Sequence, residues 1–92
     1  MKKSVLKKIE FQLAAAPGSQ VFVAGTFNNW DSEKTRMKDN PASGHYETVI
    51  ALPPGKHEYR FVVDGDWCVD PNGAEQVSNV YGSLNSVVTV TA

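Results

Sequence analysis

Apolar and polar residues alternate along most of this chain, and this period of two is the feature that most limits its fold. Between residues 5 and 13, for example, Ile9, Phe11 and Leu13 alternate with charged and amide side chains. The alternation returns at 45–52, 56–63 and 83–90, and no window shows convincing helical spacing. Because successive side chains of a strand point to opposite faces, each segment predicts a strand with one buried face.

Turn signals separate these segments. Pro17-Gly18-Ser19 ends the first strand, and Pro53-Pro54-Gly55 ends the strand at 45–52. Asp64-Gly65 predicts a tight hairpin, since both residues tolerate a positive φ. Asp70-Pro71-Asn72-Gly73 breaks the chain once more.

Shorter strands are expected between these turns, at 20–25 and 66–69. The stretch 26–44 is polar and predicts a long loop, with a short strand near 35–38. Six or seven short strands with frequent turns predict an all-β fold, an immunoglobulin-like β-sandwich. The 92 residues suffice for one domain, which we expect to span 1–92.

Charge and composition exclude several function classes. The net charge of -1 offers no basic excess for nucleic acid. The segment 5–13 is interrupted by charged residues, so we expect neither a signal peptide nor a membrane anchor, and a cytoplasmic location. Cys68 is the only cysteine, which leaves no intrachain disulfide. His45 and His57 have no matching ligands, so we expect no metal and no cofactor.

Two tryptophans stand in polar, turn-rich surroundings. Tryptophan is large and apolar, so it usually packs in a core. Trp30, however, is flanked by Asn28, Asn29, Asp31 and Ser32, and Trp67 follows the Asp64-Gly65 turn. An indole displayed in this way can stack on the apolar face of a pyranose, while its polar neighbours bond the hydroxyls at the ring edge.

Three further residues are open to two interpretations. Arg60 is either a solvated charge at the edge of a strand or a hydrogen-bond donor to sugar hydroxyls. Asn85 lies within an otherwise apolar strand, where it either bonds the local backbone or reaches a ligand. Tyr81, next to Gly82, is either packed in the core or displayed to a ligand.

Four segments in this order resemble a known family: 25–30 (GTFNNW), 59–67 (YRFVVDGDW), 70–71 (DP) and 82–86 (GSLNS). Together they look like a carbohydrate-binding module of family 48. That family includes the glycogen-binding domain of the AMP-activated protein kinase beta subunit and modules of glycogen branching enzymes. The resemblance covers about residues 20–91 and implies an early-set immunoglobulin-like sandwich.

The resemblance implies non-catalytic binding of an α-1,4-glucan such as glycogen, starch or a maltooligosaccharide. Trp30 and Trp67 would stack on glucose, and a basic residue, here Arg60, would bond sugar hydroxyls. Tyr81 would insert into the glucan, and Ser83 and Asn85 would bond the sugar. A glycogen-metabolising enzyme or regulator is the protein partner that the resemblance implies.

The chain departs from the kinase-type pattern in three ways: Arg60 replaces a lysine, Tyr81 replaces an aliphatic residue, and the loop 72–81 is one residue longer. Two alternatives to glucan binding follow. One is a protein-interaction or packing module of a glycoside hydrolase family 13-type system, without a competent sugar site. The other is a glycoside hydrolase, which needs two paired carboxyl groups that the acidic residues of the predicted turns do not evidently provide.

Overall fold

A computed structural model of the chain describes residues 5–73 and 75–91, so the ends of the predicted domain lie outside the described residues. Within this part, strands and one short 3-10 helix, η1, follow one another in the order β1 (Lys7–Ala14), β2 (Val21–Gly25), η1 (Thr26–Asn28), β3 (Lys38–Asn40), β4 (His45–Leu52), β5 (Gly55–Val63), β6 (Asp66–Cys68), β7 (Glu75–Ser78) and β8 (Leu84–Val90). The described residues contain no helix with the length and apolar character needed to cross a membrane.

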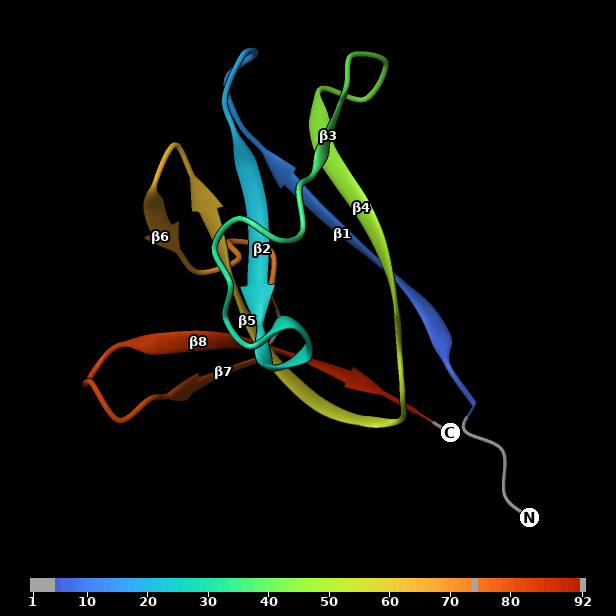
Figure 1. Cartoon of the computed structure of the whole chain (residues 1–92), viewed down its shortest axis with the longest axis vertical. Helices are drawn as coiled ribbons and strands as arrows, with labels where there is room; N and C mark the ends of the chain where they lie inside the picture. Colours follow the sequence, from blue (N-terminus) through green and yellow to red (C-terminus); the bar gives the residue numbers. More distant parts are fainter. Residues whose placement is uncertain (1–4, 74, 92) are drawn as a thin grey trace.

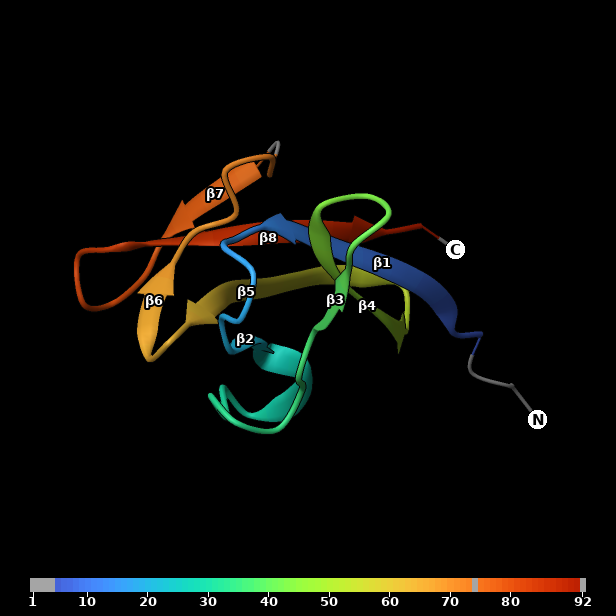
Figure 2. The ribbon, with the colours of Figure 1, turned by 90° about the horizontal axis from the view of Figure 1, so that it is seen from above.

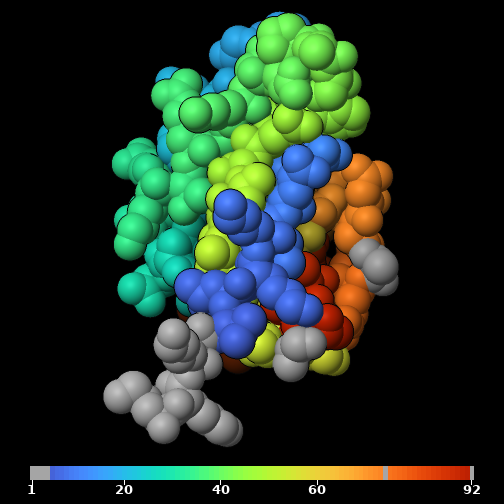
Figure 3. Space-filling model, turned by 90° about the vertical axis from the view of Figure 1, so that its right-hand side faces the viewer, coloured from blue at the N-terminus to red at the C-terminus, as the bar shows by residue number. Residues whose placement is uncertain are grey.

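The strands form two antiparallel sheets that pack face to face (Figures 1 and 2). One sheet has the order β1-β4-β3, and its outer face makes up much of the surface in Figure 3. The other has the order β2-β5-β8-β7, with β6 paired to β5. The prediction of an all-β, immunoglobulin-like sandwich is therefore confirmed.

The core lies between the two sheets and is made by the alternating apolar side chains. β1 and β4 pair along their whole length, from Lys7 opposite Leu52 to Ala14 opposite His45. Their inward residues meet those of β2 and β5, and the largest buried members are Phe11, Leu13, Met37, Tyr46, Leu52, Tyr59 and Phe61. The aromatic rings contact one another edge to face, with 5.0 Å between the ring centroids of Phe11 and Tyr59.

The predicted hairpin at Asp64-Gly65 is confirmed. Asp64 has a φ of 50° and Gly65 a φ of 88°, so both residues take the left-handed conformation that joins β5 to β6. The side chain of Asp64 also accepts a hydrogen bond of 2.8 Å from the backbone N–H of Gln20. This bond holds the hairpin against the start of β2.

Three details differ from the sequence-based expectation. β7 lies in a stretch predicted as loop, because its polar sequence EQVS shows no apolar alternation. The short strand expected near 35–38 is β3 at Lys38–Asn40, preceded by an isolated bridge between Phe22 and Arg36. Leu84 has the parity of the buried face of β8 but is 43% exposed, because it precedes the part of β8 that pairs with β5.

Candidate functional site

A hollow of about 770 Å³ opens on the side of the β2-β5-β8-β7 sheet that faces away from the core. Its wall is built from η1 and the turn after it, from β5 and β6, and from the end of β7, the start of β8 and the loop between them. Five of the residues singled out from the sequence line it: Trp30, Arg60, Trp67, Tyr81 and Asn85. Ser83 does not line it directly, but its hydroxyl contacts a residue that does.

The two indole rings lie on the same side of the domain. Their centroids are 6.5 Å apart and their planes are inclined by 39°, so the rings form a shallow, angled cradle. Trp67 is 41% exposed, whereas Trp30 is half-buried. Neither ring belongs to the hydrophobic core, which is the place that the size of a tryptophan would ordinarily favour.

A buried asparagine shapes the turn that carries Trp30. The Asn28 side chain accepts a hydrogen bond from the backbone N–H of Gly25 and donates bonds to the Val23 carbonyl and the Thr35 hydroxyl, at 2.9 to 3.0 Å. The side chain is only 6% exposed. Of the polar neighbours of Trp30, Asn28 therefore uses its amide to hold the turn together.

Backbone conformation then aims Trp30 into the hollow. Asn29 and Trp30 both have a φ of 58°, a left-handed conformation that is rare for a residue as bulky as tryptophan. The Trp30 N–H donates a bond of 2.9 Å to the Gly25 carbonyl, which helps to hold this conformation. Strained residues of this kind are concentrated at functional sites.

Gly25 is required at the base of the same turn. A Cβ atom at this position would lie 2.5 Å from the backbone oxygen of Glu58 and 2.7 Å from the Phe27 ring. The turn can therefore approach β5 closely only because this residue has no side chain. This approach brings Trp30 next to the hollow-facing side of β5.

β5 supplies two charged side chains to the hollow, Glu58 and Arg60. They are two residues apart in the strand, so they point to the same face of the sheet. Arg60 is half-buried, and its Nε atom is buried with no hydrogen-bond partner among the described residues. Arg60 therefore lies in the wall of the hollow and is not a solvated charge at the edge of a strand.

The loop between β7 and β8 is organised by Asn79. Its Nδ2 donates to the Ser83 hydroxyl at 2.8 Å and to Asn85 Oδ1 at 3.2 Å. Its Oδ1 accepts from the backbone N–H groups of Tyr81 and Ser83, at 2.9 and 3.2 Å. Two donors and two acceptor positions are all that a primary amide has, so the Asn79 side chain is saturated.

This arrangement decides what the neighbouring polar groups can still do. The Ser83 oxygen accepts from Asn79, which leaves its O–H free to donate. Asn85 is 5% exposed, accepts from Asn79 and donates 3.0 Å to Glu58 Oε1. Asn85 thus bonds neighbouring side chains while also lining the hollow.

Tyr81 stands at the tip of the same loop and is 90% exposed, which rules out core packing. Gly82 follows with a φ of 80°, and its N–H donates to the Asn79 carbonyl at 3.2 Å. The loop therefore turns sharply after Tyr81 and leaves its ring at the rim of the hollow.

Partly buried hydrogen bonds anchor Asp70, just after the strand β6 that carries Trp67, to the sheet. The Tyr59 hydroxyl donates to Asp70 Oδ2 at 2.6 Å, and the Asp70 N–H donates to the Ser86 hydroxyl at 2.8 Å. Burial, and next the bond and charge of Asp70, raise the pKa of Tyr59 well above its usual range. Burial also raises the pKa of the Cys68 thiol, so Cys68 is a poor candidate for a reactive thiolate.

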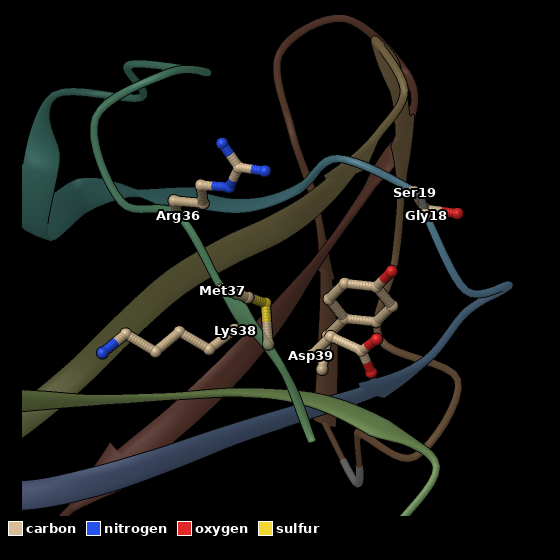
Figure 4. A pocket seen from close by; sticks show the side chains of 7 residues that line it. Gly18, Ser19, Arg36, Met37, Lys38 and Asp39 are labelled. Carbon is tan, nitrogen blue, oxygen red and sulfur yellow. The ribbon is translucent and has the colours of Figure 1, made fainter. Parts of the chain in front are cut away.

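A second hollow, of about 520 Å³, lies at the β3 end of the other sheet (Figure 4). Charged side chains of Arg36, Lys38 and Asp39 surround Met37 there. Its single aromatic residue, Tyr46, is buried and donates its hydroxyl to the Ala16 carbonyl. It therefore offers no exposed ring.

Sequence reasoning missed Glu58, Asn79 and the structural role of Asn28. An available signal for Asn79 was the asparagine at the head of a short glycine-containing loop, a position where side chains commonly bond the backbone two residues on.

In the described part of the chain, no group of three His, Cys, Asp or Glu side chains could hold a metal ion.

Comparison with known proteins gives a consistent result. Residues 8–92 match the family model described as the glycogen recognition site of AMP-activated protein kinase. The chain is 34% identical over 73 residues to 5'-AMP-activated protein kinase subunit beta-2 of Mus musculus, which covers 79% of the chain and 26% of that protein. It is 35% identical over 74 residues to subunit beta-1 of Sus scrofa, covering 79% of the chain and 56% of that protein.

The match to subunit beta-2 of Homo sapiens is similar, with 34% identity over 73 residues and 25% of that protein covered. The chain thus spans about a quarter of the length of the beta-2 subunits that it matches. The family model covers nearly all of the described sandwich, including every strand of the hollow. By this match, the chain belongs to the family of the glycogen recognition site of AMP-activated protein kinase.

Proposed function

We propose that this chain binds α-1,4-glucan, in glycogen, starch or maltooligosaccharides, and does not cleave it. The observation that carries the proposal is the angled pair of indoles, Trp30 and Trp67, on one side of the domain. Family membership supports the glycogen part of the proposal, since the family model is described as a glycogen recognition site. The stacking of sugar rings on these two indoles is our own step.

The angle between the rings favours a curved ligand. A pyranose has an apolar face of C–H groups that packs on an aromatic ring, much as apolar side chains do in protein sites. An α-1,4-linked glucose chain curls, so consecutive sugars present their faces at an angle to one another. Two indoles inclined by 39° match such a ligand better than a flat, extended chain.

Polar groups beside the rings supply the hydrogen bonds that orient a sugar. The Arg60 side chain lines the hollow and forms no ion pair with a described residue, and Ser83, which contacts the lining residue Asn79, has an O–H that is free to donate. Asn85 retains one amide hydrogen and one lone pair beyond its bonds to Glu58 and Asn79. Such a combination of aromatic area and a few fixed polar groups is typical of small-molecule sites.

The single carboxylate that lines the hollow supports binding without cleavage. Glycoside hydrolysis generally uses two carboxyl groups placed on either side of the bond that breaks. Glu58 is the single carboxylate among the described residues that line the hollow. Its Oε1 accepts a bond from Asn85, and no second carboxylate faces it across the space.

We further propose that the chain brings a glycogen-metabolising enzyme or regulator to its polysaccharide. The relatives are named as subunits of a protein kinase, and the chain spans about a quarter of the beta-2 subunits. A solvent-facing cradle holds sugar only on one side, so the affinity is expected to be about micromolar to millimolar.

A sugar titration followed residue by residue in NMR spectra tests the proposal. Maltoheptaose is expected to shift the indole N–H signals of Trp30 and Trp67, and Trp30→Ala is expected to weaken binding at least about tenfold. Val49→Ala is the matched control, since Val49 is 56% exposed on the other sheet. Unchanged indole signals at millimolar maltoheptaose would refute glucan binding at this site.

A further inference from the structure

Glu58 is the one charged residue of the hollow whose role is still unassigned. It lies in the middle of β5, opposite Val87 of β8, and is half-buried. One carboxylate oxygen, Oε1, accepts the bond from Asn85 Nδ2. The other, Oε2, has no hydrogen-bond donor among the described residues and belongs to a side chain that lines the hollow.

Glu58 and Arg60 are neighbours on one face, yet the structure holds no ion pair between these two described residues. Arg60 pairs in register with Ala24, on the β2 side, while Glu58 is drawn toward Asn85 on the β8 side. Opposite charges on neighbouring positions of one strand face often form an ion pair. Both side chains line the same hollow, and Glu58 keeps an oxygen with no donor among the described residues.

The amide of Asn85 fixes this arrangement. A carboxylate only accepts, so Nδ2 of Asn85 must face Glu58, and its Oδ1 must then face the saturated Asn79. Turning the Asn85 amide over would break both of its bonds. Turning the Asn79 amide over would break at least three of its four, since two backbone N–H groups donate to its Oδ1. The position of the Glu58 carboxylate is therefore set before any ligand arrives.

From these contacts we infer that Glu58 is a ligand-contacting, specificity-determining residue of the hollow. Glu58 accepts a hydrogen bond from one hydroxyl of a vicinal diol while Arg60 donates to its neighbour. The inference rests on the proposed glucan binding and adds to it a preference: the site selects uncharged sugar and disfavours sugar that carries a phosphate monoester.

Charge is the reason for that preference. Glu58 and Arg60 are the charged residues among those that line the hollow, so their charges balance. A neutral diol can use both groups, because a hydroxyl donates and accepts. A phosphate offers no donor to Glu58 at neutral pH and is repelled by it, which offsets its attraction to Arg60.

The test compares two probes on the full chain: maltoheptaose, and maltoheptaose bearing one phosphate monoester. In Glu58→Gln, the Kd for maltoheptaose is expected to rise about three- to tenfold, because a neutral amide is a weaker acceptor than a carboxylate. The Kd for the phosphorylated probe is expected to fall, because Arg60 is then unopposed. The Kd for the phosphorylated probe divided by the Kd for maltoheptaose should therefore fall at least about threefold.

Two variants separate charge from position. Glu58→Asp keeps the charge but withdraws the oxygens, so it should weaken maltoheptaose binding while leaving the phosphorylated probe disfavoured. Glu10→Gln removes the same charge from the exposed face of the other sheet and should leave both Kd values unchanged.

The outcomes are distinct. A ratio that changes less than threefold in Glu58→Gln, with the unsubstituted chain binding maltoheptaose, overturns the role of Glu58 and leaves glucan binding intact. An unsubstituted chain that binds neither probe overturns the proposed function, and the inference with it. If Glu58 had a purely structural role, its substitution would weaken the binding of both probes equally and would leave the ratio of their Kd values unchanged.

Discussion

The aromatic side chains of this domain form two groups that differ in what supports them. Phe11, Tyr59 and Phe61 lie between the sheets, with Phe11 and Tyr59 at 5.0 Å and Tyr59 and Phe61 at 5.7 Å. Trp30 and Trp67 lie outside the sandwich, 6.5 Å apart and partly open to water. The first group is packed on all sides by protein, and the second on one side only.

This difference indicates that one group of aromatic residues stabilises the fold and the other is available to bind a ligand. A ring enclosed by apolar neighbours contributes its buried area to folding. A ring held by a strained turn or a short edge strand contributes little to folding and keeps one face for a ligand. Substitutions in the two groups should therefore change different quantities.

The largest effect is expected for Phe61→Ala. Phe61 is fully buried at the centre of the core, so its removal should lower the free energy of unfolding by about 3–5 kcal/mol. Urea denaturation followed by circular dichroism measures the loss. A loss below about 1 kcal/mol would mean that the interior group is not what stabilises the sandwich.

Trp67→Ala should show the reverse behaviour. We expect the affinity for maltoheptaose to fall at least about tenfold, because an aromatic face of the cradle is lost. The free energy of unfolding should change by less than about 1 kcal/mol, since Trp67 is 41% exposed. Calorimetric titration and urea denaturation of the same sample check both values. If Trp67→Ala lost much stability but kept its affinity for maltoheptaose, the two aromatic groups would not differ in the way described.

Tyr59→Phe removes the hydrogen bond that joins Tyr59, a member of the interior aromatic group, to Asp70, which follows the strand of Trp67. Losing the bond of 2.6 Å to Asp70 should cost about 1–2 kcal/mol of stability at neutral pH. Because the pKa of Tyr59 is raised in the folded chain, its contribution is complete below its ordinary value of 10.0 and is lost as the pH rises beyond that value.

The stability difference between the unsubstituted chain and Tyr59→Phe should therefore shrink above about pH 10. Urea midpoints of both proteins, measured from neutral pH into this range, provide the comparison. A difference that stays constant or grows with pH would contradict the assignment of the raised pKa to this buried hydroxyl.

The smallest effect is expected for Tyr81→Ala. At 90% exposure, Tyr81 should contribute less than about 0.5 kcal/mol to folding. Because Tyr81 lies at the rim, its removal should weaken the affinity for maltoheptaose about threefold, a smaller loss than that expected for Trp67→Ala. The same pair of titration and denaturation measurements applies. An effect on affinity larger than that of Trp67→Ala would shift the centre of the site to the loop.

Much of the fold follows from local sequence. Alternation places Phe11 and Leu13 inside, and Asp64-Gly65 fixes a hairpin, because these features depend on neighbours along the chain. β7 has no such signal: its residues pair with β8 through backbone groups, which any sequence carries. Its position is decided by the strand beside it.

The site is predictable only in part, for a similar reason. Trp30 and Trp67 stand out because large apolar residues in polar segments are unusual. Asn28, Asn79 and Glu58 do not, because a polar residue in a polar stretch gives no hint of its partners. Asn28 is buried by contacts with Val23 and Thr35, which depend on the folded turn.

The saturation of Asn79 has a consequence for which sequences this loop can accept. Positions on surface loops usually tolerate exchange, yet this one needs two donors and two acceptors on one short planar group. Aspartate has no donors, and glutamine places the same amide one methylene too far. In a library of all twenty amino acids at position 79, selected for a functional loop, asparagine should be recovered almost alone, as if this half-exposed site were an interior one.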